Sequence, residues 1–258
     1  MKRSGDMLLA LDIGNTTIAV GLFRDAALLK SWKLKTDRDK TSDEYGVFLL
    51  DLFQVSGFKP EKVGATIISS VVPPLTPVFQ TVAKTYFRGD ALVVGPGLRT
   101  GMPILYENPQ EVGADRVVAA VAAFERHGGP TIIVDFGTAT TFDAVSEKGE
   151  YLGGAIAPGI QISAEALSLK TAKLPRVEIR KPVKAVGRTT VSSMQAGLYF
   201  GYIGLVNNII AEIGKELGRD VRVVATGGFG ERFISEIAAA YEPNLVLEGL
   251  RIIFDRNR

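Results

Sequence analysis

Short apolar runs, separated by small and polar residues, run along the first half of the chain. A hydrophobic run that ends at Asp12 precedes a tight loop and two further runs, which predicts a strand followed by a hairpin. Three later segments predict helices, and the last ends at Gly128-Gly129-Pro130, a typical stop signal. The predicted strands are residues 8–11, 18–23, 27–34, 65–69 and 91–94, and the predicted helices are residues 42–54, 75–87 and 112–127.

The same pattern starts again in the second half, where a strand ends at Asp135 before a small-residue loop and a hairpin. Residues 12–16 and 135–140 share an Asp, a hydrophobic residue, a Gly and small or polar residues, which favours a duplication over chance similarity. We therefore predict an α/β protein with two related lobes, residues 1–128 and 129–258, and a nucleotide cleft between them. The later strands are predicted at 131–134, 141–145, 151–156, 222–225 and 245–247. Helices are predicted at 159–169 and 189–217, followed by one that ends at Tyr241 and one at the C-terminus.

Rare residue types exclude several kinds of chemistry. The chain has no Cys and a single His, His127, so thiolate catalysis, cysteine zinc sites and multi-histidine metal sites are excluded. A Ser-His-Asp triad is possible only through His127, which we expect at the surface, at a helix C-terminus. The net charge of +2 is too small to predict a nucleic-acid or membrane partner. Any bound metal is expected to be a hard cation held by oxygen.

The first loop has residues suited to phosphate binding. Asp12, at a strand end, can hold magnesium directly or through water, and Gly14 permits a tight turn close to a ligand. Successive amides, with the side chains of Asn15 and Thr16, can surround phosphate oxygens. An ordinary β-turn would explain this loop equally well if it stood alone.

The second loop offers the same means, with Gly137 at the turn and the hydroxyl groups of Thr138, Thr140 and Thr141 as donors. Two loops of this kind favour the binding of a triphosphate between them, from both sides. A third glycine-rich segment, residues 226–230, joins a strand to a helix and suits either a nucleotide contact or a structural turn. Neither a P-loop nor a Rossmann glycine motif is present in the sequence.

A further polar pair begins the predicted helix 112–127. Asp115 can cap that helix while Arg116 remains a solvated charge. Alternatively, Asp115 accepts the proton of a substrate hydroxyl and Arg116 holds an anionic group. The two residues alone leave both alternatives open.

The segment 189–211 has no charged residue and is long enough to cross a bilayer. Its Thr, Ser, Gln and Asn side chains are costly in hydrocarbon, so a buried or interface helix is predicted instead. Gly197 and Gly201 have the spacing that lets two helices approach closely. Residues 1–6 are polar and show no secretory signal, and the absence of Cys agrees with a cytoplasmic protein.

Seven short motifs, each weak alone, form a highly specific set in this order. They are D-I-G-N-T at residues 12–16, Y-E-N-P at 106–109, G-A-D-R at 113–116, D-F-G-T-A-T-T at 135–141, G-G-A-I-A-P-G at 153–159, G-R-T-T at 187–190 and T-G-G at 226–228. From residue 8 to about residue 257 the chain resembles the type III pantothenate kinases, of the acetate and sugar kinase/Hsp70/actin superfamily. The resemblance implies lobes of the actin/ribonuclease H-like type.

The resemblance also implies ATP-dependent phosphorylation of pantothenate to 4′-phosphopantothenate, the first step toward coenzyme A. It implies that Asp12 positions magnesium and phosphates, that Asp115 acts on the pantothenate hydroxyl, and that Asp135 holds a monovalent cation, potassium or ammonium. The implied nucleotide contacts are Asp12, Gly14, Asn15, Thr16, Gly137, Thr138, Thr141, Gly227 and Gly228. The implied pantothenate contacts are Tyr106, Gly113, Asp115, Arg116 and Thr190, of which Thr190 would reach the neighbouring subunit's site in a homodimer.

Two other functions were weighed against this one. Another kinase of the superfamily, acting on a sugar or small acid, would keep both phosphate loops but change residues 106–109 and 113–116. A non-catalytic nucleotide-binding regulator would be expected to lack at least one of Asp12, Asp115 and Asp135, and no basic helix-turn-helix supports DNA binding. We therefore expect a cytoplasmic kinase with no nucleic-acid or membrane partner.

Overall fold

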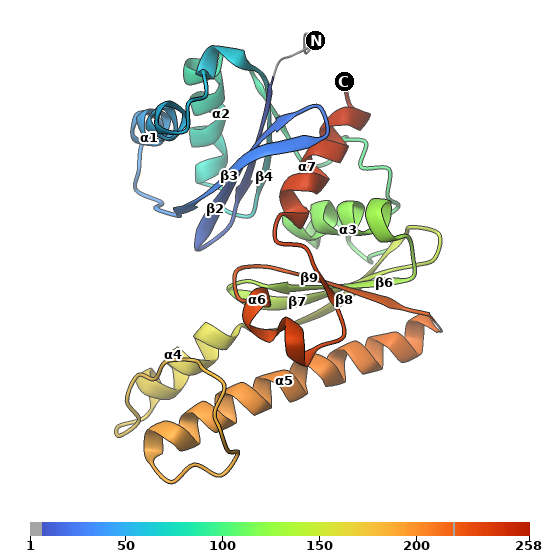
Figure 1. The fold of residues 1–258 in the computed structure, drawn as a ribbon. Helices are drawn as coiled ribbons and strands as arrows, with labels where there is room; N and C mark the ends of the chain where they lie inside the picture. The colour runs from blue at the N-terminus through green and yellow to red at the C-terminus, as the bar shows by residue number, and fades with distance from the viewer. Residues whose placement is uncertain (1–6, 219) are drawn as a thin grey trace. The chain divides into compact units, whose positions relative to one another are not determined.

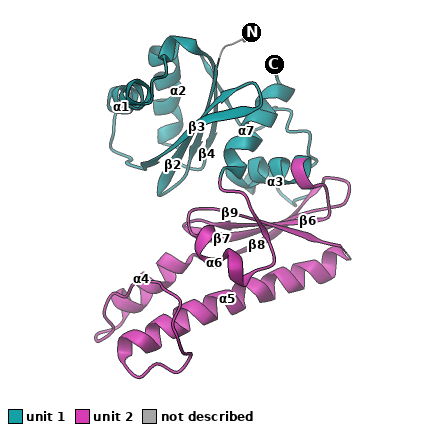
Figure 2. Cartoon of the chain, viewed as in Figure 1, with its two compact units in different colours: residues 1–125, 244–258 teal, residues 126–243 magenta. Residues whose placement is uncertain are grey.

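The computed structural model describes residues 7–218 and 220–258, so the polar leader 1–6 lies outside the described residues. The chain forms two compact units, one made of residues up to 125 together with 244–258 and the other of residues 126–243 (Figure 2). The change of unit after residue 125 lies close to the boundary predicted at 128/129. The segment 244–258 was expected in the second lobe, but its contacts group it with the first unit.

The first unit is built on a mixed five-stranded sheet of order β3-β2-β1-β4-β5 (Figure 1). β1 lies in the middle, antiparallel to β2 and parallel to β4. Every β1 residue except Asp12 is buried, as expected for a strand covered on both faces. The strands are β1 (Met7–Ile13), β2 (Thr17–Arg24), β3 (Ala27–Lys35), β4 (Val63–Ser70) and β5 (Ala91–Val93).

Helices cover both faces of this sheet. Alternate β1 residues such as Leu9 join a core with α1 (Ser42–Val55) and α2 (Leu75–Tyr86) on one face. On the other face, α7 (Leu245–Arg256) contacts β1, β2 and β4. α3 (Ala114–His127) packs so closely on α7 that a Cβ on Gly249 would lie 2.1 Å from the Val118 carbonyl oxygen. Short 3₁₀ helices span Pro60–Lys62 and Pro109–Glu111.

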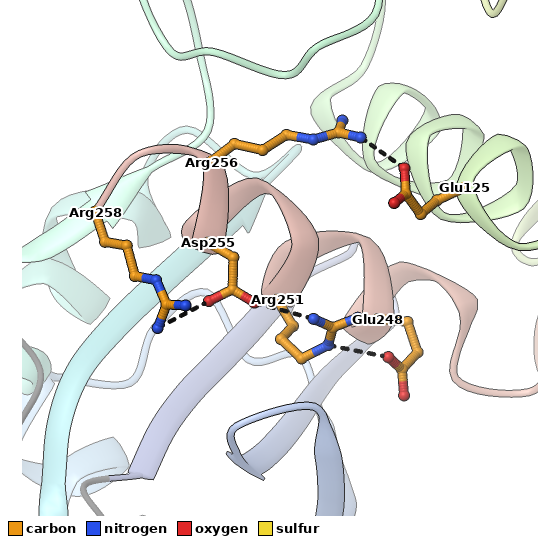
Figure 3. A network of polar contacts seen from close by, with 6 residues as sticks. All are labelled: Glu125, Glu248, Arg251, Asp255, Arg256 and Arg258. Carbon is orange, nitrogen blue, oxygen red and sulfur yellow. Dashed lines mark hydrogen bonds and ion pairs between the residues drawn. The ribbon is translucent and has the colours of Figure 1, made fainter. Parts of the chain in front are cut away.

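Polar contacts fasten the C-terminal helix into the first unit. Arg256 pairs with Glu125 near the end of α3 at 2.7 Å, and further ion pairs run along α7 (Figure 3). Asn257 accepts a hydrogen bond from the Arg99 amide at 3.0 Å and donates one to the Arg99 carbonyl at 2.9 Å. The strand predicted at 245–247 is therefore wrong, because these residues form the first turn of α7.

The second unit contains a mixed five-stranded sheet of order β10-β9-β6-β7-β8. α4 (Ile160–Lys170) and α5 (Thr190–Leu217) contact β7, and α5 also contacts β6. The helix predicted up to Tyr241 is replaced by α6 (Gly230–Phe233), a 3₁₀ turn at Ile234–Glu236 and a short strand. The strands are β6 (Thr131–Phe136), β7 (Ala139–Val145), β8 (Tyr151–Pro158), β9 (Arg222–Thr226) and β10 (Ala240–Tyr241).

The two sheets have the same connectivity. In each, the first strand lies in the middle, an antiparallel hairpin follows on one side, and two parallel strands extend the other side. β1 and β6, which end in the two matching loops, therefore hold the same place. This correspondence confirms the prediction of two related α/β lobes.

α5 has the length and composition of a membrane-spanning helix, the one such helix in the part of the chain that the structure describes. Its side chains Leu198, Tyr202 and Val206 nevertheless belong to the core of the second unit. One face of α5 therefore packs in this core, although only 28% of its apolar window is buried.

Candidate functional site

The first of the two loops predicted to bind phosphate, residues 12–16 (the first phosphate loop), begins at the carboxyl end of β1. Asp12 lies in register with Ser69 of β4, and its Oδ1 atom is buried. The Gly14 amide donates to the Thr17 carbonyl at 3.1 Å, and a Cβ on Gly14 would lie 2.9 Å from that oxygen. Glycine is therefore required for this turn, which leaves Asn15 and Thr16 exposed.

The second loop predicted to bind phosphate, residues 135–141 (the second phosphate loop), begins at the carboxyl end of β6 with the half-buried Asp135. Thr138 is exposed, and a Cβ on Gly159 would lie 2.2 Å from the Thr138 carbonyl, so the end of β8 packs tightly on the loop. Thr141 is half-buried and lies 3.4 Å from Asp143. The expectation that Thr140 is a phosphate donor is wrong, because its buried hydroxyl lies 2.6 Å from that of Tyr202.

The structure brings the glycine-rich loop after β9 onto the second phosphate loop, because β9 runs parallel to β6. Gly227 has a φ of +92°, and a Cβ there would lie 2.4 Å from Asp135 Oδ1. The Phe229 amide donates to the Phe136 carbonyl at 3.3 Å. Nothing lies within 4 Å of a Cβ placed on Gly228, which leaves open space for a ligand there. Within this unit, Asp135 and Gly227 therefore pack against each other, and Gly228 follows next in the chain.

Asp115 lies in the first turn of α3, in a space that a glycine leaves for it. Its Oδ1 atom accepts a hydrogen bond from the Arg116 amide at 2.8 Å, and a Cβ on Gly113 would lie 2.6 Å from the same oxygen. Burial raises the pKa of Asp115 above its usual range, although the Arg116 amide and guanidinium oppose the shift. A half-buried carboxyl with a raised pKa is suited to accept a proton.

The remaining predicted acceptor residues lie on different elements. Tyr106 is half-buried on the loop before the 3₁₀ turn at 109–111. Thr190 is exposed at the start of α5, where Thr189 caps the helix by accepting from the Ser192 amide at 3.1 Å. Tyr106 belongs to the first unit and Thr190 to the second.

Sequence reasoning missed one side chain at the first loop. Arg38, which follows β3, donates a hydrogen bond from Nη2 to Asn15 Oδ1 at 2.9 Å. The predicted hairpin could have indicated this contact, because β3 runs antiparallel to β2 and so ends beside the first loop.

A cavity of about 330 Å³ lies in the second unit and contains none of the predicted site residues. It is lined by charged and aromatic side chains from the segment before α5, from α5 and from the α6 region, including Arg180, Lys181, Tyr199, Arg232 and Glu236. Lys181 pairs with Glu236 at 2.5 Å, so part of the cavity's charge is already neutralised within the protein.

Comparison with known sequences gives a single family. The chain matches the type III pantothenate kinase family over residues 8–212. It is 54% identical over 253 residues to the type III pantothenate kinase of Myxococcus xanthus, covering 97% of this chain and 99% of that protein. It is 52% identical over 254 residues to the Geobacter sulfurreducens enzyme of the same name, covering 98% of this chain and all of that one.

Solved structures support the fold at low identity. A Campylobacter jejuni protein described as a Baf family transcriptional activator is 19% identical, with a TM-score of 0.60 and coverage of 96% and 97%. The activator of 2-hydroxyisocaproyl-CoA dehydratase from Clostridium difficile, solved with ADPNP, is 14% identical, with a TM-score of 0.58 and coverage of 97% and 95%. At such identities the likeness shows the fold alone, that of the actin-like kinases and ATPases.

Proposed function

The chain belongs to the type III pantothenate kinase family, and from this premise we propose which residues carry the reaction. The enzyme phosphorylates pantothenate to 4′-phosphopantothenate in coenzyme A biosynthesis. The observation that carries the assignment of roles is that Asp12, Asp115 and Asp135 each stand beside a turn or helix start shaped by a glycine. We place the enzyme in the cytoplasm, with ATP as phosphoryl donor.

Asp12 and the first loop would hold the phosphates of ATP and a magnesium ion. No group of three or more acidic, His or Cys side chains that could hold a metal occurs among residues 7–218 and 220–258. Magnesium commonly takes one or two carboxylates and completes its shell with water and phosphate oxygens, so Asp12 fits this role. When bound, the ion would neutralise charge on the transferred phosphoryl group. Gly14, Asn15 and Thr16 would contact the phosphate oxygens.

Asp115 would orient the pantothenate hydroxyl and accept its proton during transfer. Its raised pKa supports this role, because the carboxylate is a better proton acceptor than an ordinary Asp. Arg116 would hold the pantothenate carboxylate through charge-assisted hydrogen bonds. Gly113 keeps space beside Asp115, and Tyr106 would line the same acceptor pocket.

Asp135 would hold the monovalent cation next to the triphosphate. Its Oδ1 atom lies against Gly227, where only a residue without a Cβ leaves room. Backbone carbonyls of the second phosphate loop and of the loop after β9 could complete the oxygen ligands. Gly137, Thr138 and Thr141 would contact phosphates, and Gly227 and Gly228 the adenosine. The open space at Gly228 supports the adenosine contact.

We also propose a homodimer with a shared acceptor site. A Cβ placed on Gly197, Gly201 or Gly204 of α5 would meet no atom within 4 Å, so one side of this helix is uncovered in the single chain. Thr190 starts the same helix and is exposed. Packing of two α5 helices would cover the glycines and carry Thr190 toward the partner's acceptor pocket.

A direct test combines the purified protein with ATP, magnesium, potassium and pantothenate. We expect pantothenate-dependent ADP release and a product heavier than pantothenate by one phosphoryl group, detected by mass spectrometry. A panel of sugars and small hydroxy acids serves as the control for another kinase of the superfamily. Phosphorylation of a panel compound in preference to pantothenate would contradict the assignment.

A further inference from the structure

The segment after β3 wraps around the first phosphate loop. Thr36 donates from Oγ1 to the Gly14 carbonyl at 2.7 Å, and its amide donates to the Thr16 carbonyl at 3.0 Å. Two residues further on, Arg38 Nη2 donates to Asn15 Oδ1 at 2.9 Å. The guanidinium therefore lies at the exposed tip of the loop, although it is distant from the loop in sequence.

A buried tyrosine, Tyr45, holds the backbone of Asp37, which lies between Thr36 and Arg38. The Tyr45 hydroxyl accepts a hydrogen bond from the Asp37 amide at 2.9 Å and donates one to the Asp37 carbonyl at 2.8 Å. The Tyr45 ring is 2% exposed and packs on Phe79 in the core. The backbone that carries Arg38 is therefore anchored to the core on one side and to the phosphate loop on the other.

The two phosphate loops have no cation of their own. Residues 12–16 and 135–141 include no Lys and no Arg, whereas a triphosphate carries several negative charges. An arginine offers donors in a fixed fork that matches phosphate oxygens. Because Asn15 Oδ1 accepts from Arg38, the Nδ2 group of the same amide is the part of Asn15 left to donate to an anion.

We propose that Arg38 is the phosphate-binding cation of the first loop and contacts the terminal phosphates of ATP. The inference rests on the proposed nucleotide role of residues 12–16. Asn15 holds the guanidinium at the loop tip, and Thr36 and Tyr45 hold the backbone that carries it. The contact is exposed, so it contributes little to folding stability. It uses Nη2 alone, and the guanidinium has further N–H donors for phosphate oxygens.

The first test compares Arg38→Ala and Arg38→Lys with the control Arg24→Ala. Arg24 is also exposed but pairs with Met7, at the opposite end of β1 from the loop. We expect Arg38→Ala to lower kcat/KM for ATP roughly 10- to 100-fold, the effect of losing a charge-assisted hydrogen bond. The KM for pantothenate and the melting temperature should stay near wild type, and Arg38→Lys should recover part of the loss. Equal ATP kinetics for Arg38→Ala and Arg24→Ala would overturn the proposal.

A binding measurement separates phosphate contact from loop positioning. By calorimetry, Arg38→Ala should weaken binding of the non-hydrolysable analogue AMP-PNP much more than binding of AMP. Equal weakening of both nucleotides would overturn the proposal and assign Arg38 to loop structure. Nucleotide binding is measured without pantothenate, so the result is valid even if the wild-type protein does not phosphorylate pantothenate. Failure of the proposed function would therefore be distinguished from failure of the Arg38 proposal.

Discussion

The hydroxyl oxygens of Thr140 and Tyr202 lie 2.6 Å apart inside the second unit, joining the second phosphate loop to α5. Tyr202 is buried on the helix, whereas its neighbour Gly201 is exposed on the face proposed for dimerisation. Burial raises the pKa of Tyr202 to about 12, so the phenol keeps its proton over the working pH range. A single turn of α5 thus supports the loop on one side and offers a surface on the other.

Replacing Tyr202 by Phe removes this contact and leaves the buried Thr140 hydroxyl without the phenol. We expect a loss of about 1 kcal/mol or more in the free energy of unfolding. The control is Tyr199→Phe, which removes a longer, 3.3 Å contact with Glu236 from another buried tyrosine of α5. Urea unfolding of the two variants measures the difference, and equal midpoints would contradict a structural role for the Thr140–Tyr202 contact.

Asp115→Asn should separate catalysis from folding. We expect turnover to fall roughly 10²- to 10⁴-fold, the usual contribution of a general base, while AMP-PNP still binds. Because burial raises the pKa of Asp115 in the folded state, the ionised carboxyl lowers stability once the pH rises through that value. The neutral Asn should therefore melt at the same temperature as wild type, or higher, at pH 7. Near-normal turnover in the variant would show that Asp115 only caps the helix and takes no part in catalysis.

The same raised pKa sets the pH dependence of the wild-type reaction. Activity requires ionised Asp115, so it should be lost on acidification at a higher pH than an ordinary Asp would give. The kcat/KM profile for pantothenate measures this acid limb. A limb at the usual pKa of an exposed Asp would show that the carboxyl is not shifted in the free enzyme.

The proposed cation site predicts a dependence on the buffer salt. With magnesium present, activity should be low in sodium and rise with potassium or ammonium, because the family resemblance implies such an ion at Asp135 and neither phosphate loop has a Lys or Arg to offset the triphosphate charge. Asp135→Asn should weaken this response while the protein remains folded. Rates that are equal in sodium and potassium at matched ionic strength would exclude the site.

Two adjacent glycines provide a matched test of the loop after β9. Gly227→Ala places a Cβ against Asp135 at a φ of +92°, so we expect a loss of about 1–3 kcal/mol in stability and a sharp loss of activity. Gly228→Ala meets no atom within 4 Å and should fold normally. A raised KM for ATP in Gly228→Ala would support the adenosine contact. Similar melting temperatures for the two variants would contradict the described packing.

The dimer prediction is tested with Gly201→Arg in α5. A charged side chain on the uncovered face should yield monomers that lose pantothenate phosphorylation and keep part of their affinity for ATP. Gly89→Arg, in the turn before β5, also meets open space and serves as the control. Sedimentation and kinase assays on the same preparations decide the outcome. A fully active monomer would refute the shared site, and an unaffected dimer would refute the choice of helix.

The strand, loop and hairpin pattern that occurs in both halves was sufficient to predict two related lobes, and the equivalent strand orders of the two sheets confirm that prediction. Contacts between segments that are distant along the chain could not be predicted from the sequence. The approach of Arg38 to Asn15 depends on the register of β2 and β3. The failure at Leu245–Leu247 has a different cause, because three apolar residues do not distinguish a strand from a helix turn. The packing of Gly249 on Val118 decides that case.

The place of α7 has a consequence for the order in which the protein matures on the ribosome. The sheet face formed by β1, β2 and β4 is translated early, but the helix that covers it comes from the last residues of the chain. Residues 126–243, in contrast, form a continuous unit that is complete before α7 is made. The first unit therefore keeps an apolar sheet face uncovered during synthesis until α7 has been made and can pack against it.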